Sequence, residues 1–472
     1  MTDPKIHISR KSYAAIAISL FFLSSCGGFD DDGPVDPPLQ TTTASTITLS
    51  PAAVASAARL RQPVNMNSRT GIVMMHPYSS YINFRGCEEL AKRGFTTLCV
   101  DSPFTGKQYD YYGYEQHVPT IRAAIQHLRS MPNITKVLLF GHSMGAPMMT
   151  FYQNVAENGT SVCTGPEKLM PCVTTNLVNV PPADGVILFD AHLGGSLATF
   201  TYVDPAVINN TLGSRDPTLD MFNPANGYNP ATNGAVYSEQ FRQRFLAAQA
   251  ARNKQLNDQA LSLLAQKRAA TGDPTQMGDD IPFRVVGATS ARLFQPDLEL
   301  LKCTQQPVLL LARDGSTPTQ IVCSVRTPSG NATEALSASS VLNVNVHTWL
   351  GALALSSTGN YNQTVNDITG INYDSTATST VGNITGVTKP LLIVANSGHY
   401  FLRPDEIVFN TARMSDKTFA ITEGATHGGT ECTACETALN LPVPASADSF
   451  GYYGDTFTRT MNFMGHWIRT RY

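Results

Sequence analysis

The stretch Gly141-His142-Ser143-Met144-Gly145 decides the fold because of the residues on either side of it. The apolar run 135–140 before it is rich in strand-forming residues, and from Ala146 onward the sequence has a helical pattern. A serine in a sharp turn between a buried strand and a helix holds its hydroxyl clear of the sheet. The two glycines allow the turn to tighten, because a Cβ at either position would clash. The pattern therefore predicts that Ser143 is a nucleophile.

Strands and helices alternate on both sides of this turn. The predicted strands are 71–76, 95–100, 135–140, 185–189, 390–395 and 417–421, and the predicted helices include 87–93, 118–128, 404–413 and 457–468. Alternation at this rhythm predicts a parallel sheet with right-handed crossovers.

The alternation stops between about residues 194 and 388, where Pro, Asn, Gly and Thr are frequent. One long polar helix is predicted over 238–270. A hairpin is predicted in which 308–312 pairs with 320–325 around Asp314-Gly315. We interpret this block as an insertion that caps the sheet.

The N-terminus has the features of an export signal. Three basic residues precede the apolar run Ala14–Leu23, which is too short to span a bilayer as a mature helix. Leu23-Ser24-Ser25-Cys26 then resembles the bacterial lipobox, in which the cysteine is lipidated and becomes the new N-terminus. We predict a signal peptide over 1–26, lipidation of Cys26, and a lipid-anchored protein in the bacterial cell envelope. A plain secretory signal cleaved nearby is the alternative.

Residues 27–62 are poor in large apolar side chains and rich in Asp, Pro and Thr, so we predict a flexible tether there. Eight cysteines remain besides Cys26, and an even number in an exported chain indicates disulfides. Pairing of neighbours in sequence is the simplest arrangement: Cys87 with Cys99, Cys163 with Cys172, Cys303 with Cys323, and Cys432 with Cys435. The last pair could instead be a redox or metal motif. The net charge is −3 and no basic block occurs, so nucleic acid is not an expected partner.

A second motif gives the chain a resemblance to a known superfamily. His427 lies in Gly-Ala-Thr-His-Gly-Gly just after the last predicted strand, and Ser143 precedes it in the chain. In these features the chain resembles the α/β-hydrolase superfamily, whose order is nucleophile, acid, histidine. The resemblance implies an α/β fold with a mostly parallel sheet and helices on both faces. It implies a core of 63–195 and 386–472, with a cap over 196–385 inserted after the strand that ends at Asp190. Because few residues precede Gly71, we expect the sheet to be reduced at its leading edge.

The acid of the triad is ambiguous in the sequence. Its usual superfamily position, shortly beyond the 390–395 strand, falls near His399, where no carboxylate stands. Some superfamily members carry the acid after the strand that follows the nucleophile, and Asp190 ends that strand here. We therefore predict Asp190, with Glu406 or Asp405 as alternatives and Asp314 as a more distant one.

The oxyanion hole is expected to use two backbone N–H groups. Met144, directly after the nucleophile, is one predicted donor. The superfamily usually has His-Gly after the first of these strands, whereas this chain has His76-Pro77. Because proline has no N–H, Tyr78 is the second predicted donor, and His76 is expected to order the loop.

These residue types indicate acyl transfer. A serine hydroxyl is a poor nucleophile at neutral pH unless a histidine takes its proton, and a buried carboxylate orients that histidine. We predict an exported serine hydrolase that cleaves small-molecule or lipid-like carboxylic esters through an acyl-enzyme, without a metal or organic cofactor. Lipase, thioesterase and amidase activities are alternatives within the superfamily. A non-catalytic binding or adhesion protein on the same scaffold is an alternative from a different functional class. Nothing in the sequence indicates the oligomeric state.

Overall fold

The computed structural model describes residues 38–49, 55–289, 291–442 and 450–472. The predicted signal peptide, the lipidation site Cys26 and residues 27–37 of the predicted tether lie outside the described residues. We describe the unit Pro38–Tyr472 by itself.

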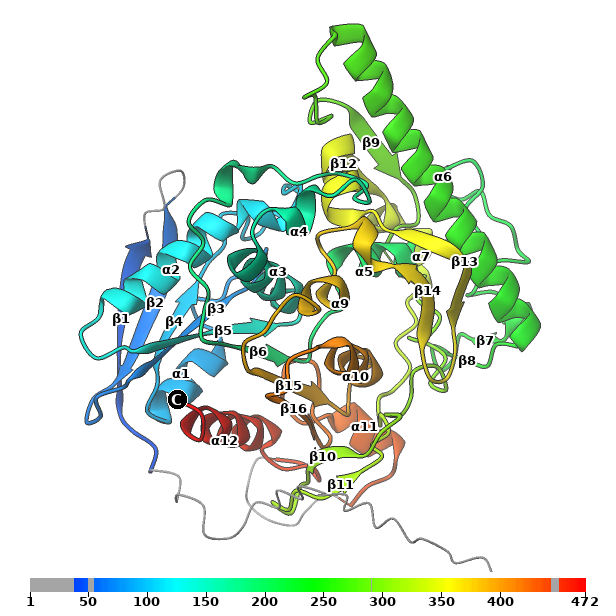
Figure 1. Cartoon of the computed structure of the whole chain (residues 1–472). Coiled ribbons are helices and arrows are strands. Elements are labelled where there is room, and N and C mark those ends of the chain that lie inside the picture. Colours follow the sequence, from blue (N-terminus) through cyan, green and yellow to red (C-terminus); the bar gives the residue numbers. More distant parts are fainter. Residues whose placement is uncertain (1–37, 50–54, 290, 443–449) are drawn as a thin grey trace, which may run out of the picture. The chain divides into compact units, whose positions relative to one another are not determined.

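A ten-stranded sheet forms the centre of this unit, and Figure 1 shows its strands side by side. Their spatial order is β1-β2-β4-β3-β5-β6-β15-β16-β10-β11. Neighbouring strands are parallel from β4 to β10 and antiparallel at the two edges. The strands are β1 (Thr42–Leu49), β2 (Ser56–Pro63), β3 (Thr70–Met75), β4 (Thr96–Val100), β5 (Lys136–His142), β6 (Gly185–Phe189), β10 (Val308–Leu311), β11 (Thr319–Gln320), β15 (Leu391–Asn396) and β16 (Lys417–Thr422).

The leading edge of the sheet corrects two predictions. β1 and β2 pair antiparallel, and β2 pairs antiparallel with β4. The prediction of a flexible tether is therefore wrong for the strand residues before Gln62, and the sheet is not reduced at this edge. Ala58 and Leu60 of β2 are buried while their neighbours are more exposed. These buried apolar side chains and the backbone pairing on both sides attach a strand whose composition is otherwise mostly polar.

Helices cover both faces of the sheet, as the superfamily resemblance implied. Alternate residues of β3 face opposite sides: Val73 and Met75 join one cluster of buried side chains, and Ile72 and Met74 join another. The helices α1 (Arg85–Lys92) and α12 (Thr456–Arg469) pack on the Ile72 side, and α2 (Val118–Ser130), α3 (Gly145–Asn158) and α10 (Leu402–Thr411) pack on the other. The apolar positions predicted for the closing helix are buried: Phe457, Met461, Met464 and Ile468.

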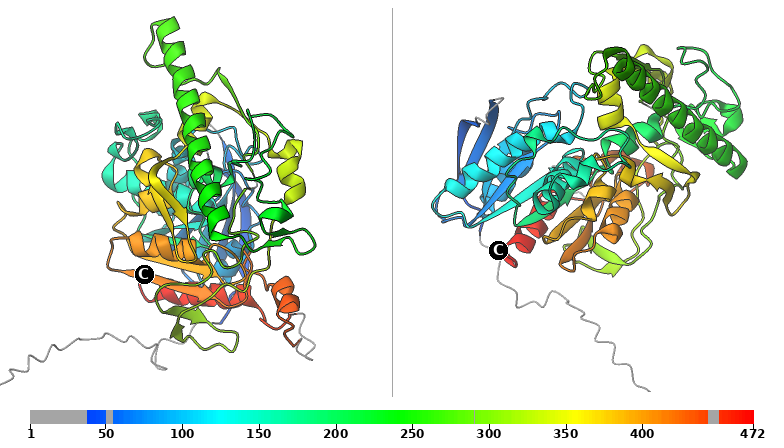
Figure 2. Two further views of the ribbon diagram at one scale, coloured as in Figure 1. Left: turned by 90° about the vertical axis from the view of Figure 1, so that its right-hand side faces the viewer. Right: turned by 45° about the horizontal axis from the view of Figure 1, so that its top comes forward.

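The insertion contains the predicted long helix, α6 (Glu239–Thr271), which is the long green helix of Figure 2. Ser238 caps its start by accepting a hydrogen bond from the N–H of Phe241. The predicted hairpin also forms, since β10 and β11 pair antiparallel. However, β10 also pairs parallel with β16, so the prediction that 196–385 lies wholly outside the sheet is wrong. The apolar residues of β10 are buried by completing the sheet beyond β16.

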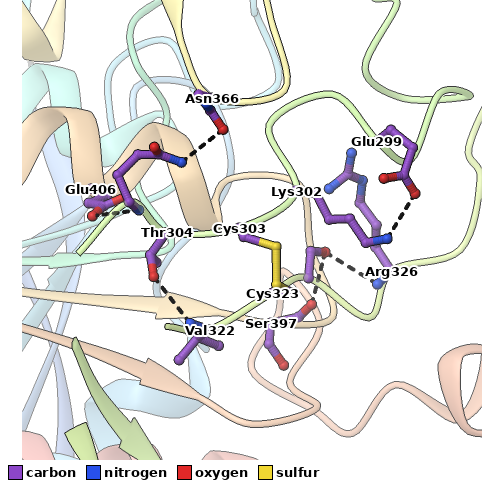
Figure 3. Close-up of a disulfide and its surroundings, with 12 residues drawn as sticks. Glu299, Lys302, Cys303, Thr304, Val322, Cys323, Arg326, Asn366, Ser397 and Glu406 are labelled. Carbon is purple, nitrogen blue, oxygen red and sulfur yellow. Dashed lines mark hydrogen bonds and ion pairs between the residues drawn. A yellow bond between two sulfur atoms is a disulfide. The ribbon is translucent and has the colours of Figure 1, made fainter. Parts of the chain in front are cut away.

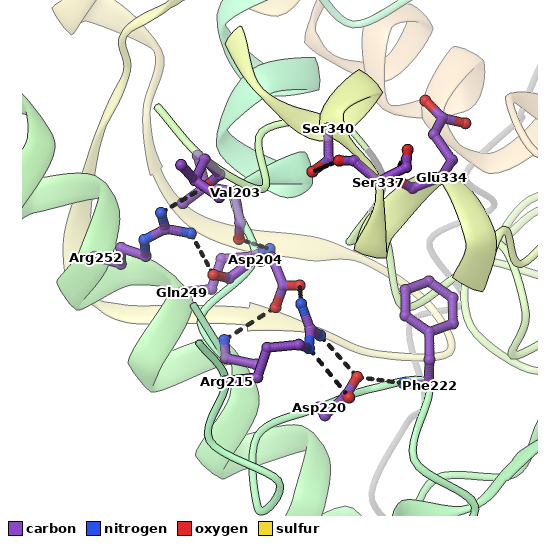
Figure 4. A network of polar contacts seen from close by, with 12 residues as sticks. Val203, Asp204, Arg215, Asp220, Phe222, Gln249, Arg252, Glu334, Ser337 and Ser340 are labelled. Atoms are coloured by element: carbon purple, nitrogen blue, oxygen red, sulfur yellow. Dashed lines mark hydrogen bonds and ion pairs between the residues drawn. The ribbon is translucent and has the colours of Figure 1, made fainter. Parts of the chain in front are cut away.

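Buried amides attach α6 to the chain that follows α5 (Gly195–Tyr202). The Gln249 amide donates to the backbone carbonyls of Thr201 and Val203, at 2.9 and 3.0 Å. Figure 4 shows the adjoining charged cluster, in which Arg215 lies between Asp204 and Asp220 at 2.7 and 2.8 Å. These contacts hold α6, the end of α5 and residues 204–220 together within the insertion.

Smaller elements complete the unit. The remaining strands are β7 (Tyr228–Asn229), β8 (Gly234–Ala235), β9 (Pro282–Val285), β12 (Leu342–Asn345), β13 (Ser356–Gln363) and β14 (Ile368–Asn372). The remaining α-helices are α4 (Ser161–Thr164), α7 (Ala332–Leu336), α8 (Val346–Thr348), α9 (Thr380–Ile384) and α11 (Thr433–Ala438). The 3₁₀-helices are η1 (Tyr114–Gln116), η2 (Thr174–Asn176), η3 (Pro224–Asn226), η4 (Ala338–Ser340) and η6 (Tyr373–Ser375), and η5 (Trp349–Leu353) is a π-helix.

The eight cysteines other than Cys26 form the four pairs of sequence neighbours given above. Figure 3 shows the pair Cys303–Cys323, which joins the approach to β10 with the chain after β11. Within the described ranges, no helix combines the length and the apolar character needed to traverse a bilayer.

Candidate active site

The turn that carries Ser143 is tight and left-handed. Ser143 has a φ of 55°, a conformation that L-residues rarely adopt. A Cβ on Gly141 would lie 2.7 Å from the backbone of Ala146, and one on Gly145 would lie 2.7 Å from the carbonyl oxygen of Met75. Both neighbours are backbone atoms that cannot move aside, so both glycines are required. The turn leaves the hydroxyl at the carboxyl end of β5.

The structure brings Ser143, His427 and Asp190 together in one hydrogen-bonded line. The Oγ of Ser143 lies 2.8 Å from Nε2 of His427, and Nδ1 of His427 lies 2.5 Å from Oδ2 of Asp190. The three residues follow β5, β16 and β6, so the carboxyl ends of three strands position them. Asp190 is fully buried, whereas the side chain of His427 is 35% exposed. The arrangement can therefore pass a proton between the serine and a group that enters from the cavity.

A second imidazole contacts the same carboxylate. Nδ1 of His399, in the loop after β15, lies 2.7 Å from Oδ2 of Asp190, and its ring stacks on His427 with centroids 4.4 Å apart. The N–H of Asn396 donates to the other oxygen, Oδ1, at 3.2 Å. Burial alone would raise the pKa of Asp190, but His399 and His427 outweigh it and hold that pKa below its ordinary value. Asp190 is thus kept in its ionised form.

The alternative acids lie elsewhere. Asp405 accepts a hydrogen bond from the N–H of Ala191 at 3.0 Å, and burial raises the pKa of Asp405 well above its ordinary value. Glu406 instead accepts from the N–H groups of Gln305 and Gln306. Figure 3 shows Glu406 among the surroundings of the Cys303–Cys323 disulfide. Among the described residues, neither Asp405 nor Glu406 is hydrogen-bonded to His427. Their carboxylates are instead engaged by these backbone N–H groups.

Asp314 is farther from the site. It lies in the turn between β10 and β11, where it accepts hydrogen bonds from the N–H and the hydroxyl of Ser316 at 2.9 and 2.6 Å. This is the ordinary local role of an aspartate in a hairpin turn. Asp190 is therefore the predicted acid that the geometry places against the histidine.

Two further residues, which the sequence analysis did not single out, hold the histidine loop. Nε2 of His142, inside the Gly-His-Ser-Met-Gly motif, donates to the backbone carbonyl of His427 at 2.8 Å, and Nδ1 accepts from the hydroxyl of Tyr81 at 2.6 Å. Burial, reinforced by His427, lowers the pKa of His142 to about 3, so this imidazole stays neutral. Its place directly before the nucleophile is the sequence signal that could have indicated this role.

The two predicted oxyanion donors border the same cavity as Ser143. Met144 immediately precedes α3, and N–H groups at the start of a helix have no partner within it. The N–H of Tyr78 lies 3.3 Å from Nδ1 of His76, while the N–H of Ser79 donates to the same atom at the shorter distance of 2.9 Å. His76 therefore orders this loop, as expected, and burial lowers the pKa of His76.

A cavity of about 680 Å³ opens over the serine and is bounded by two walls. The wall at the ends of the sheet strands includes Tyr78, Ser143, Met144, Tyr400 and His427. The wall from the insertion includes Tyr202, Arg292 and Glu334. A volume of this size accommodates a small organic molecule.

The sequence matches the alpha/beta hydrolase family over residues 72–322, more than half of the chain. The chain belongs to the α/β-hydrolase family. This membership confirms the fold predicted from the strand–turn–helix around Ser143, and it supports a hydrolase. No curated protein matches the sequence.

Several solved structures resemble this α/β-hydrolase at low identity. Est1E from Butyrivibrio proteoclasticus is 10% identical, with a TM-score of 0.35, over 84% of this chain and 94% of that one. A proline iminopeptidase from Mycobacterium smegmatis is 12% identical, with a TM-score of 0.38, over 90% and 98% of the two chains. A putative lipase from Acinetobacter baumannii is 9% identical, with a TM-score of 0.31, over 81% and 83%. We assign no substrate from these similarities.

Asp190, His399 and His427 also present one ligand atom each within 4.8 Å of one another, a set that could hold a metal ion. An ion in this position would take the lone pairs of His427 Nδ1 and the Asp190 carboxylate. It would thereby replace the hydrogen bond that orients His427 in this α/β-hydrolase. The set is chemically able to bind a metal, but its geometry is also that of a serine–histidine–carboxylate triad.

Other residues of the site could not have been found in the sequence. His399 occupies the region where the α/β-hydrolase acid was first sought, and its contact with Asp190 depends on two strands being neighbours in the sheet. Arg292 lies in a loop without periodicity, and only the folding of the insertion over the sheet brings it to the cavity.

Proposed function

We propose that this protein is a serine hydrolase that cleaves carboxylic esters through an acyl-enzyme intermediate. The observation that carries the proposal is the line of two short hydrogen bonds from Ser143 through His427 to Asp190. Family membership supports hydrolysis as the reaction class.

The geometry suggests the following steps. The Oγ of Ser143 attacks the ester carbonyl carbon while Nε2 of His427 takes the hydroxyl proton, and a tetrahedral intermediate forms. His427 then gives that proton to the departing alkoxide, which leaves as the alcohol, and the acyl group remains on Ser143. A water molecule then attacks the acyl carbon while His427 takes its proton. The bond between the acyl carbon and Oγ of Ser143 breaks, His427 returns the proton to Oγ, and the carboxylic acid leaves.

Asp190 keeps the Nδ1–H of His427 directed away from the serine and stabilises the imidazolium that forms in each step. The negative charge that develops on the substrate oxygen would be stabilised by the N–H groups of Met144 and Tyr78. These two donors remain predictions about the loaded site.

A fluorophosphonate probe tests the nucleophile directly. We expect it to label Ser143, and we expect Ser143→Ala to abolish both labelling and hydrolysis of short nitrophenyl esters. Ser339→Ala is the matched control, because Ser339 is a second serine that lines the cavity, on the wall from the insertion. Intact esterase activity in the Ser143→Ala protein, or an unlabelled wild-type protein, would reject the proposal. The second result would favour a non-catalytic binding protein.

The leaving group distinguishes an esterase from its rivals in the family. Matched oxygen esters, thioesters, anilides and long-chain esters of one acyl group should be compared by kcat/KM. We expect the short oxygen esters to react fastest.

We also propose that the protein is exported and anchored to the cell envelope by a lipid on Cys26. The proposal rests on the basic leader, the apolar run 14–23 and the lipobox-like residues that end at Cys26. Labelling of growing bacterial cells with a palmitate analogue should mark the wild-type protein but not Cys26→Ser. Equal labelling of both would overturn the anchor.

A further inference from the structure

Arg292 is a buried cation on the wall of the proposed active site. It lies between β9 and β10, its residue is only 3% exposed, and it lines the cavity that contains Ser143 and His427. A guanidinium keeps its charge at any physiological pH, so its burial calls for a compensating group.

The partners of Arg292 within the protein are all uncharged. Nε donates to the hydroxyl of Thr201 at 3.0 Å, and Nη1 donates to the hydroxyl of Tyr400 at 3.4 Å. The guanidinium carbon lies 3.9 Å from the centre of the Tyr202 ring. These contacts orient the side chain but supply no negative charge.

The contact with His192 leaves an excess of hydrogen-bond donors. Nη2 of Arg292 lies 3.1 Å from Nε2 of His192, and the N–H of Gly194 lies 3.0 Å from Nδ1 of the same ring. Burial and the charge of Arg292 lower the pKa of His192, so the imidazole is neutral and has one lone pair. It can accept only one of the two N–H groups. An acceptor entering from the cavity would satisfy the surplus donor.

Two other buried arginines have carboxylate partners, whereas a third, Arg326, donates to the backbone carbonyls of Phe294 and Leu300 and does not line the described cavity. Arg93 is 2.8 Å from Glu89, and Arg403 is 2.9 Å from Glu406. Among the residues that the structure describes, no carboxylate pairs with Arg292. Glu334 is the only acidic residue in the described cavity lining, and its carboxylate accepts a hydrogen bond from Asn331 at 3.0 Å.

We propose that the ester substrate carries a carboxylate group in addition to the scissile ester, and that Arg292 binds this carboxylate through its two Nη nitrogens. The planar fork of a guanidinium matches the two oxygens of a carboxylate, and the interaction is strengthened where water is excluded. The inference rests on the proposed function, since it assigns a substrate class to the same cavity.

Paired substrates test the inference. We would measure hydrolysis of the mono-4-nitrophenyl esters of adipic, pimelic and suberic acids, each against the methyl ester of its free carboxyl group. For the chain length that fits best, wild-type kcat/KM should be about 10- to 100-fold higher for the free acid, chiefly through a lower KM. A preference for the methyl ester at every length would overturn the proposal.

Three variants identify the residue responsible. Arg292→Gln should bring the ratio of kcat/KM for acid and methyl ester close to one, and Arg292→Lys should restore part of it, because the charge returns without the fork. Arg284→Gln is the matched control, because it removes an exposed guanidinium of β9 outside the described cavity lining, and it should keep the wild-type preference. If Arg292→Gln lowered kcat/KM for the free acid and for the methyl ester by the same factor, their ratio would stay at the wild-type value. Arg292 would then have a structural role only, and the inference would fail.

A binding measurement separates this inference from the proposed function. Calorimetric titration of the Ser143→Ala protein with adipate, pimelate, suberate and sulfate needs no turnover. Binding of a dicarboxylate that disappears in the Ser143→Ala, Arg292→Gln double variant supports the anion site even if no ester is hydrolysed. Absence of dicarboxylate binding, or equally tight binding of sulfate, would overturn the carboxylate assignment even if esters are hydrolysed.

Discussion

Glu115 and Arg292 are both buried charged side chains, yet the protein treats them differently. Glu115 belongs to the 3₁₀-helix before α2, is 2% exposed, and accepts a hydrogen bond from the N–H of Val173 at 3.1 Å. Among the described residues, neither has an oppositely charged partner. Burial raises the pKa of Glu115 to about 7, so this side chain can lose its charge by binding a proton.

Arg292 has no such route, because a guanidinium does not give up its proton in a protein. Its position on the cavity wall places the permanent charge where a ligand can reach it, whereas Glu115 is not part of that wall. Asp190 is a third case: it is buried, but two imidazoles compensate its charge. Of these three side chains, Arg292 and Asp190 keep their charge and lie at the cavity or in the triad, whereas Glu115 can be neutralised and lies outside the described cavity lining.

The largest expected effect concerns the compensated charge. Asp190→Asn should lower kcat by about 10⁴-fold for every ester, because an amide cannot stabilise the imidazolium and favours the wrong tautomer of His427. Steady-state kinetics on a neutral and an anionic ester would measure it. Glu406→Gln is the control, and it should cost less than about tenfold, because Glu406 contacts backbone N–H groups and Arg403 rather than His427. The reverse ranking would assign the acid to Glu406.

The sequence could predict the elements of the regular strand–helix alternation and the polar residues that directly follow an apolar strand. Strand–helix alternation gave β3 to β6 and β15 to β16, and Asp190 could be proposed because it directly follows an apolar strand. β1 and β2 escaped prediction because most of their residues are polar or small and few are large and apolar. β10 was predicted as a hairpin strand, but its place in the central sheet was missed because its parallel partner, β16, lies about a hundred residues later.

Contacts that depend on two distant loops could not be predicted. His399 meets Asp190 only because β15 lies beside β6 in the sheet. Arg292 meets His192 across exactly 100 sequence positions, through a segment with no regular pattern. In both cases the residue type alone is compatible with many structural roles, and the tertiary fold selects one.

A smaller effect is expected from the charge that can be neutralised. The pKa of Glu115 is raised from 4.5 to about 7 in the folded protein, so the folded state binds the proton more tightly than the unfolded state. The free energy of unfolding should therefore fall by about 3 kcal/mol as the pH rises from 4.5 to 7, and it should stay at the lower value above pH 7. Glu115→Gln should remove this slope. Urea unfolding at pH 5 and pH 8 measures it, and an equal pH dependence in both proteins would show that Glu115 does not titrate as described.

The smallest expected effect concerns an uncharged hydrogen-bonded link that supports the loop of His427 from outside the described cavity lining. Tyr81→Phe removes the hydrogen bond to Nδ1 of His142, whose other nitrogen holds the carbonyl of His427. Loss of one such bond is worth about 1 kcal/mol, so kcat should fall about three- to tenfold. KM should be unchanged, because Tyr81 acts on the position of the histidine and not on the substrate.

Tyr472→Phe is the matched control for Tyr81→Phe. It also removes one hydrogen-bonded hydroxyl, but that part-buried hydroxyl donates to the carbonyl of Asp184, just before β6 and at the opposite end of that strand from Asp190. It should leave kcat within about twofold of wild type. Equal losses of kcat in the two variants would indicate general loosening of the sheet. A loss of kcat confined to Tyr81→Phe would show that Tyr81 and His142 position His427 through uncharged hydrogen bonds. Arg292, in contrast, is proposed to act through a permanent charge.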